Sequence, residues 1–387
     1  MRATAAVLVA TAVALAGCTS GTPAGPVVSS APAAAGTSTT PESGSSPDAS
    51  SLPSPTPSPV STTTTVATGL SVPWGLALLG DGSALVTERD TARVLLVRPG
   101  ARPRVLGRVP GVVPGGEGGL LGIALSPHFA SDHQLFVYAT TAGDNRVLRM
   151  SLRDNVLRAD RVILSGIPKA GKHNGGRLAF GPDGDLYVTT GDAGFRQNAQ
   201  DRGSLGGKIL RVTADGAPAP GNPFPGSPVW TLGHRNVQGI AWDVHGRMYA
   251  SEFGQDTWDE LNLIRPGANY GWPLVEGIGH RAGFVDPLVQ WPTDDASPSG
   301  LAIGADGAAY LAALRGECLW RVPLDGGTSA GQPRRLLYRS YGRLRTVVSA
   351  PDGRLWLVTG NTFRGSPRPG DDRIVILPTD WFREALP

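Results

Sequence analysis

Four polar segments carry the residue types that could bind or transform a small molecule. They are KHNGGRLAFGPDG with His173, TLGHRNVQG with His234 to Asn236, residues 251–273, and YGRLRTVVSAPDG with Arg343 and Arg345. In an extended strand, residues two apart point to the same side, so Arg343 and Arg345 form a fork of two guanidinium groups. Such a fork suits a carboxylate-rich ligand. The alternative is a pair of solvated surface arginines.

A repeated pattern, an apolar strand, a turn and a second apolar strand, must position these segments. Its six copies begin at Gly75, Gly122, Arg177, Gly239, Gly300 and Val347, 47 to 62 residues apart. Four copies place Asp-Gly in the turn, which is typical of a tight hairpin because Gly supplies a positive φ. This period matches a four-stranded propeller blade. We predict an all-β fold, a single six-bladed β-propeller over residues 66–387; a β-sandwich with accidental repeats is the alternative.

Composition excludes several other classes of protein. Gly (53) and Pro (34) are abundant and charged residues make up 17% of the 387 residues, which argues against a coiled coil or helical bundle. The net charge is +3, and no Lys/Arg cluster is interleaved with aromatic residues. We therefore expect no nucleic-acid partner. Propellers usually place function on the loops at one end of the channel, where the polar segments should meet.

The N-terminal residues 1–17 are typical of a bacterial export signal. Arg2 precedes an apolar run over residues 5–16, which is too short to span a membrane. The run ends in LAGC, which resembles a lipobox with Cys18 as the lipidated residue; an ordinary secretory signal is the alternative. Residues 18–65 are rich in Ser, Thr, Pro and Ala, so we predict a disordered tether that holds the propeller outside the cytoplasm at the cell membrane. The remaining cysteine, Cys318, predicts no intrachain disulfide and fits a buried apolar position.

Together the motifs resemble those of the soluble quinoprotein glucose and aldose sugar dehydrogenases, the glucose/sorbosone dehydrogenase family. The resemblance covers residues 70–377. It is carried by GGLLGIAL (118–125), HNGGRL (173–178), GGKILRV (206–212), TLGHRNVQG (231–239), and DELNLI with GANYGWP (259–273). It implies a six-bladed propeller that binds pyrroloquinoline quinone (PQQ) and calcium. It also implies oxidation of the C1 hydroxyl of an aldose to the lactone, with electrons passing to an external or respiratory acceptor.

The resemblance assigns roles to individual residues. His173 matches the general base that takes the hydroxyl proton while hydride passes to the quinone. The cofactor-binding positions are Glu117, Arg235, Asn236, Arg315, Arg343 and Arg345. The backbone carbonyls of Gly254 and Gln255 match the calcium site that polarises the quinone, since calcium prefers hard oxygen ligands. Glu260 and Tyr270 match a second, structural calcium site.

The chain departs from the family pattern on the sugar side of the site. Glu117 replaces a common Gln, and Lys172, Ala193 and His280 stand where members carry other residues. A carboxylate near an anionic cofactor is unfavourable unless it is protonated or metal-bound. Two hypotheses follow: a membrane-tethered quinoprotein dehydrogenase acting on an aldose or related polyol, and a non-catalytic propeller that binds a glycan or protein at the cell envelope. Convergence of the polar segments on one channel mouth would favour the enzyme.

Overall fold

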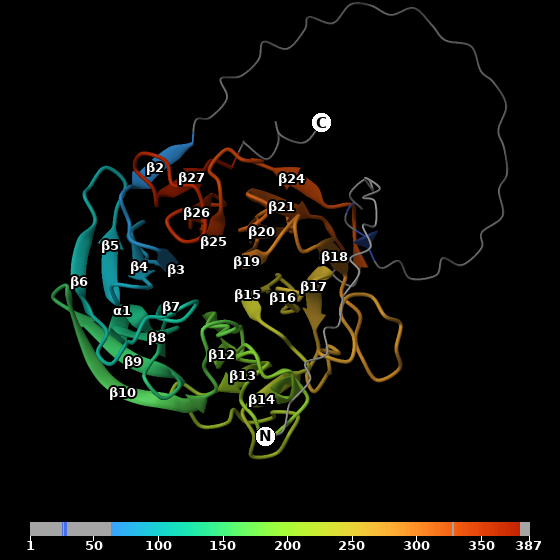
Figure 1. Ribbon diagram of the computed structural model, residues 1–387. Helices are drawn as coiled ribbons and strands as arrows, with labels where there is room; N and C mark the ends of the chain where they lie inside the picture. The colour runs from blue at the N-terminus through green and yellow to red at the C-terminus, as the bar shows by residue number, and fades with distance from the viewer. Residues whose placement is uncertain (1–24, 26, 29–62, 327–328, 380–387) are drawn as a thin grey trace, which may run out of the picture.

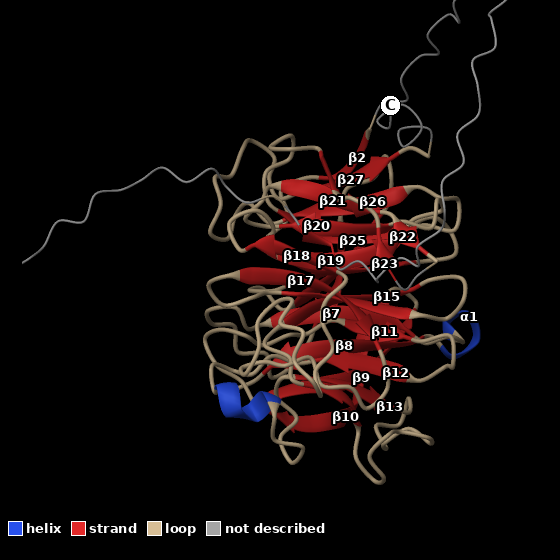
Figure 2. Cartoon of the chain, turned by 90° about the vertical axis from the view of Figure 1, so that its right-hand side faces the viewer, coloured by secondary structure: helices blue, strands red, loops and turns tan. Residues whose placement is uncertain are grey.

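The six repeats fold into six antiparallel sheets, which stand as blades in a ring around a central channel (Figure 1). The computed structural model describes residues 25, 27–28, 63–326 and 329–379. Seen from the side, the strands lie edge-on and loops project from both faces of the ring (Figure 2). The six-bladed β-propeller predicted from the repeats is confirmed. Cys18 and the export signal lie outside the described residues.

The first three blades follow the chain in order, each from its innermost strand outward. Blade 1 contains β3 (Pro73–Leu78), β4 (Ala84–Glu88), β5 (Arg93–Val97) and β6 (Arg104–Arg108). Blade 2 contains β7 (Leu120–Leu125), β8 (Gln134–Thr140), β9 (Asn145–Arg153) and β10 (Val156–Ile167). Blade 3 contains β11 (Leu178–Phe180), β12 (Leu186–Thr189), β13 (Lys208–Val212) and β14 (Val229–Leu232).

The last three blades include strands from both ends of the described chain. Blade 4 contains β15 (Val237–Trp242), β16 (Met248–Glu252), β17 (Trp258–Ile264), β18 (Val289–Pro292) and the short β1 (Val27–Val28). Blade 5 contains β19 (Pro298–Ile303), β20 (Ala309–Ala313), β21 (Cys318–Val322) and β24 (Arg334–Leu336). Blade 6 contains β25 (Leu344–Ser349), β26 (Leu355–Thr359), β27 (Ile374–Leu377) and β2 (Thr64–Ala67). Smaller elements are α1 (Phe129–Asp132), a 3₁₀ turn at Arg196–Ala199, and the hairpin β22 (Leu324–Asp325) with β23 (Ser329–Ala330).

Apolar side chains fill the space between neighbouring blades. There are six buried clusters in the described structure, one for each adjacent pair of blades. Between blades 4 and 5, for example, the rings of Trp291 and Trp320 lie 5.7 Å apart. Because the sheets are covered on both faces, their strands are nearly continuous apolar runs. Cys318 is fully buried in the same cluster, and burial raises the pKa of its thiol to about 12, as befits an apolar packing residue.

The N-terminal strand closes the ring. In β2, Thr64 pairs with Ile376 and Thr65 with Val375 of β27, so blade 6 combines both ends of the propeller. Figure 1 shows the blue β2 beside the red β27. The propeller therefore begins at Thr64, two residues before the predicted boundary.

Within the predicted tether, β1 pairs with β18, so these two residues are an exception to the expected disorder. No helix in the described ranges has the length and apolar character needed to cross a membrane.

Candidate active site

A cavity of about 270 Å³ opens at the end of the channel where the innermost strands begin. Its walls are rich in cations, and they include four of the residues predicted from the sequence. The lining residues are Trp74, Arg89, Glu117, Gln238, Phe253, Ser297, Leu314, Arg315, Arg343, Arg345, Phe363 and Arg364. The fold thus brings Glu117, Arg315, Arg343 and Arg345 together from loops far apart in the sequence.

Arg343 and Arg345 form the predicted fork at the start of β25. Arg345 is buried and donates from Nη1 to Oε1 of Gln238 at 2.9 Å and to Oγ of Ser299 at 3.2 Å. Arg343 is half-buried and donates from Nη1 to the carbonyl of Leu314 at 3.3 Å. The buried Nε of Arg343 has no partner among the described residues. Neither arginine is a solvated surface residue, so that alternative is wrong.

The fork carries positive charge without a carboxylate partner. No Asp or Glu in the described part of the chain lies within 4 Å of either guanidinium, whereas Arg315 and Arg364 each have an acidic partner. Burial and the neighbouring Arg343 lower the pKa of Arg345 to about 9. Burial also lowers the pKa of Arg343. Unpaired buried charge is costly, so an anionic ligand in this cavity would be strongly favoured.

His173 and Asp192 form a buried pair that does not line this cavity but adjoins Glu117, which does. Nδ1 of His173 lies 2.7 Å from Oδ1 of Asp192. Asp192 also accepts hydrogen bonds from Nε1 of Trp272 at 2.8 Å and from the backbone N–H of Gly194 at 2.7 Å. Burial would raise the pKa of Asp192, but its hydrogen bonds, that from His173 first, lower it below its ordinary value. The ionised carboxylate can accept a proton from Nδ1, and in that tautomer Nε2 is the ring nitrogen free to take a proton.

The loop around His173 is held on both sides of the residue. His173 has a left-handed φ of 56°, which is uncommon for a residue other than glycine. Its carbonyl packs against Gly191, where a Cβ atom would lie 1.9 Å from the oxygen, and accepts the N–H of Ala193 at 3.1 Å. Its own N–H donates to Oε2 of Glu117 at 2.9 Å. These contacts fix the direction of the imidazole.

Glu117 links this loop to the arginine-lined wall. Its Oε1 accepts a hydrogen bond from Nη1 of Arg364 at 2.9 Å, while Oε2 accepts the backbone N–H of His173. The carboxylate is therefore neutralised by an arginine. Arg315 lies at the rim, with a side chain 58% exposed and paired with Asp294 at 2.6 Å.

Arg235 and Asn236 lie beside the cavity and do not line it. Arg235 is buried and donates from Nη1 to the carbonyl of Phe253 at 3.1 Å and from Nε to Oε1 of Gln255 at 3.3 Å. Oδ1 of Asn236 accepts the N–H of Gly175 at 2.9 Å, which ties blade 4 to the His173 loop. Nδ2 of Asn236 is buried without a partner among the described residues, so it is free to donate to a ligand.

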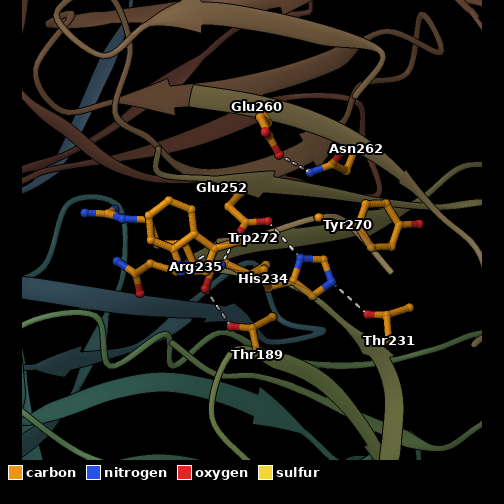
Figure 3. A network of polar contacts seen from close by, with 12 residues as sticks. Thr189, Thr231, His234, Arg235, Glu252, Glu260, Asn262, Tyr270 and Trp272 are labelled. Atoms are coloured by element: carbon orange, nitrogen blue, oxygen red, sulfur yellow. Dashed lines mark hydrogen bonds and ion pairs between the residues drawn. The ribbon is translucent and has the colours of Figure 1, made fainter. Parts of the chain in front are cut away.

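Carboxylates gather on the other side of these residues, in blade 4. Glu252 on β16 and Glu260 on β17 occupy directly opposite positions on these two adjacent strands (Figure 3). Glu252 contacts Nδ1 of His234 at 2.8 Å. Glu260 accepts hydrogen bonds from Nδ2 of Asn262 at 3.0 Å and from the N–H of Gly277 at 2.7 Å. Burial, followed by the charge of Glu252, raises the pKa of Glu260 to about 8, so this region favours a bound cation.

A cavity of about 10 Å³ lies among these groups, lined in part by Glu252, Glu260, Tyr270 and Glu276. It has room for a single water molecule or ion. The hydroxyl of Tyr270 points elsewhere: it donates to the carbonyl of Leu263 at 2.7 Å. Only the main chain of Tyr270 is therefore available to an ion.

The segment predicted to hold calcium through Gly254 and Gln255 wraps around a carboxylate. The backbone N–H groups of residues 255–258 all lie 2.8 to 3.3 Å from Oε1 of Glu276. The carbonyls of Gly254 and Gln255 accept no hydrogen bond from any described residue. No three His, Cys, Asp or Glu side chains in the described ranges are grouped as a metal site. A cation here would therefore need carbonyl ligands as well as carboxylates.

The positions that depart from the family pattern are spread out. Lys172 is exposed, Ala193 is buried against the His173 loop, and His280 is 79% exposed and paired with Asp286 at 2.7 Å. Sequence reasoning missed Asp192, which orients His173. The available signal was an acidic residue three positions after the end of a buried strand, in the Gly-Asp pair before Ala193.

Comparisons with known proteins agree with this geometry. The family profile described as Glucose / Sorbosone dehydrogenase matches residues 70–364. The solved PQQ-bound aldose sugar dehydrogenase of Streptomyces coelicolor is 57% identical, with a TM-score of 0.79 over 81% of this chain and 95% of that one. The aldose sugar dehydrogenase YliI of Escherichia coli is 29% identical over 76% of this chain and 90% of its own length. Quinoprotein glucose dehydrogenase B of Acinetobacter calcoaceticus is 32% identical over 53% of this chain and about half, 51%, of its own length.

Proposed function

The chain belongs to the glucose/sorbosone dehydrogenase family, and we propose that it is a PQQ-dependent oxidoreductase. Its substrate is an aldose or related polyol, whose C1 hydroxyl is oxidised to the lactone. One observation carries the proposal: Arg343 and Arg345 hold unpaired positive charge in a cavity beside the His173–Asp192 pair. The PQQ-bound relative from Streptomyces supports it.

The residues present fit an anionic, planar quinone that bears carboxylates. Arg343 has a buried Nε without a partner, and Asn236 has a buried Nδ2 without one, within the described structure. The fork presents guanidinium donors, which pair well with carboxylates. When bound, the cofactor supplies the hydride acceptor.

His173 performs the proton chemistry. Asp192 keeps the proton on Nδ1, so Nε2 takes the proton of the sugar's C1 hydroxyl as hydride leaves the C1 carbon. The positive charge that develops on the imidazole is stabilised by the adjacent carboxylate of Asp192 at 2.7 Å. Glu117 holds the main chain of His173 in place.

Calcium is part of the proposal. Free carbonyls at Gly254 and Gln255, and the buried carboxylate of Glu260 beside the main chain of Tyr270, are hard oxygen ligands of the kind that calcium prefers. An ion at the first site would polarise the cofactor, and an ion at the second would neutralise buried carboxylates.

The test uses the full-length chain purified in detergent and stripped with chelator. Reduction of a dye across a panel of aldoses should require both PQQ and calcium, and mixing should change the absorbance spectrum of PQQ. If no sugar is oxidised and the spectrum does not change, the enzyme is excluded. The non-catalytic propeller that binds a glycan or protein would then stand.

We further propose that the protein is lipid-anchored at Cys18 on the outer side of the bacterial cell membrane, where a respiratory or other external acceptor takes the electrons. The support is the LAGC sequence and the composition of residues 18–65. Mass spectrometry of the mature N-terminus should find acyl chains on Cys18, and Cys18→Ser should release the protein from the membrane fraction. A wild-type N-terminus without acyl chains, or a Cys18→Ser variant that stays in the membrane fraction, would contradict the anchor.

A further inference from the structure

A second cavity, of about 300 Å³, opens at the opposite end of the channel. All six innermost strands contribute to it, and the side chains that line it are apolar except for those of Arg177 and Ser349, with polar main-chain atoms exposed between them. Trp242 and Ile123 are among the apolar wall residues. This cavity is therefore chemically unlike the cation-rich one at the other mouth. Known ligand pockets are of this size and combine apolar side chains with a few placed polar groups.

Arg177 is the feature that selects the ligand. It is half-buried, and burial lowers its pKa to about 9. It donates from Nε to the carbonyl of Gln238 at 2.8 Å and from Nη2 to Oγ1 of Thr346 at 3.1 Å. Nη1 has no hydrogen-bond partner, and no carboxylate lies within ion-pair distance, among the described residues. Within the described structure, Arg177 is thus a cation at the wall of this cavity without a carboxylate partner.

Nearby acidic residues do not supply that charge. The hairpin turns at this end of the channel carry Asp81, Asp183, Asp243, Asp306 and Asp352. Each of them forms an ion pair with an arginine of its own blade, namely Arg98, Arg211, Arg247, Arg321 and Arg354. These carboxylates are therefore already engaged.

We propose that this cavity is a binding site for a small apolar monocarboxylate. Its carboxylate pairs with the free edge of the Arg177 guanidinium. Its hydrocarbon part, an aromatic ring or short aliphatic chain, packs against the apolar side chains that line the cavity. The pairing satisfies Nη1 and desolvates apolar surface at once. The proposal is independent of the activity assigned to the other mouth.

This site and the cavity at the other mouth are linked through residues that contact both. Gln238 accepts a hydrogen bond from Arg177 through its main-chain carbonyl and another from Arg345 through its side-chain Oε1. The guanidinium carbons of Arg177 and Arg345 lie 4.3 and 5.7 Å from the centre of the Trp74 ring. A single polar layer thus separates the two cavities.

The test is calorimetric titration of benzoate into the full-length chain loaded with PQQ and calcium, with benzyl alcohol as the uncharged analogue. We expect benzoate to bind, and benzyl alcohol to bind about tenfold more weakly or worse, because a charged hydrogen bond is lost. Arg177→Gln should weaken benzoate by a similar factor. Absence of benzoate binding, or equal binding of the two compounds, would overturn the proposal.

A second pair of variants decides the case should Arg177→Gln fail to fold. Ser349→Asp places a negative charge in the cavity wall, and Ser349→Asn is its uncharged match in size. Benzoate affinity should fall about tenfold or more in Ser349→Asp and stay nearly unchanged in Ser349→Asn. Benzoate binding that persists in Ser349→Asp but disappears in Arg343→Gln would locate the ligand at the other mouth and refute the proposed site.

Discussion

The two sides of the active-site mouth carry an excess of opposite charge. On the side of blade 6, Arg343 and Arg345 have no carboxylate partner within the described structure. On the side of blade 4, Glu252 and Glu260 lie buried together, and the pKa of Glu260 is raised to about 8 by burial and by Glu252. Between them, the carboxylate of Asp192 is hydrogen-bonded to Nδ1 of His173 and so is satisfied within the protein. The difference separates charged groups that lack a partner in the protein, and are available to ligands, from groups that are hydrogen-bonded to one another.

The largest effect should come from the pair of His173 and Asp192. His173→Ala removes the proton acceptor, so kcat/KM should fall about 10²- to 10⁴-fold, while PQQ binding is largely kept. Steady-state dye reduction and PQQ titration measure the two effects. His280→Ala is the matched control, because that histidine is 79% exposed and pairs only with Asp286 in the described contacts. A His173→Ala enzyme within tenfold of the wild type would contradict the role of His173.

The cationic side should respond next. Arg343→Gln removes one guanidinium from the fork, so PQQ affinity should drop about 10- to 150-fold, the range for losing a hydrogen bond to a charged group. Equilibrium titration followed by PQQ absorbance measures the change. Arg354→Gln, at an exposed arginine paired with Asp352, serves as the control. Equal affinity in Arg343→Gln and wild type would mean that the fork binds something else.

The anionic side should respond to calcium. Saturation of a site that exists only in the folded state stabilises by about 2.7 kcal/mol at a hundredfold excess over Kd. Calcium should therefore raise the Tm of chelator-stripped protein, and Glu260→Gln should reduce that rise. Magnesium, which prefers a tighter octahedral shell, should have less effect. If calcium and magnesium raise the Tm equally, and if calcium raises the Tm of Glu260→Gln as much as that of the wild type, then Glu260 does not bind calcium.

The smallest effect concerns how the free energy of unfolding changes at acidic pH. Hydrogen bonds lower the pKa of Asp192 in the folded protein below the ordinary 3.8, so its carboxylate stabilises the fold above that pH. This contribution is lost as pH falls through the still lower folded pKa. Asp192→Asn should cost about 1 to 2 kcal/mol of unfolding free energy at pH 7, and the difference from wild type should shrink below about pH 4. Denaturant titrations at several pH values measure it; a gap that widens in acid would reverse the assigned sign.

Much of the fold could be read from the sequence, because a blade is a local structure. The Asp-Gly turns and apolar strand pairs predict each hairpin, and their number predicts the ring. The closing strand β2 could not be found this way, because its partner β27 lies more than 300 residues away. The short β1 is hidden for the same reason.

The site was less predictable, because its residues meet only after the ring has closed. The fork of Arg343 and Arg345 was visible, since two residues on one strand face the same way. Asp192, by contrast, is an ordinary acidic residue until folding places it 2.7 Å from His173. The bond from Glu117 to the His173 main chain also depends on two loops from different blades.

Closure of the ring by β2 has a mechanical consequence. A pull applied at Thr64 acts directly on a strand of four residues whose pairing with β27 shifts register near Ala67. That ladder is the seam of the ring, and it lies on the outer edge of blade 6, whereas Arg343 and Arg345 lie at its innermost strand. Under load the propeller should yield first at its rim by peeling of β2, and the catalytic mouth should be the last part of that blade to feel the force.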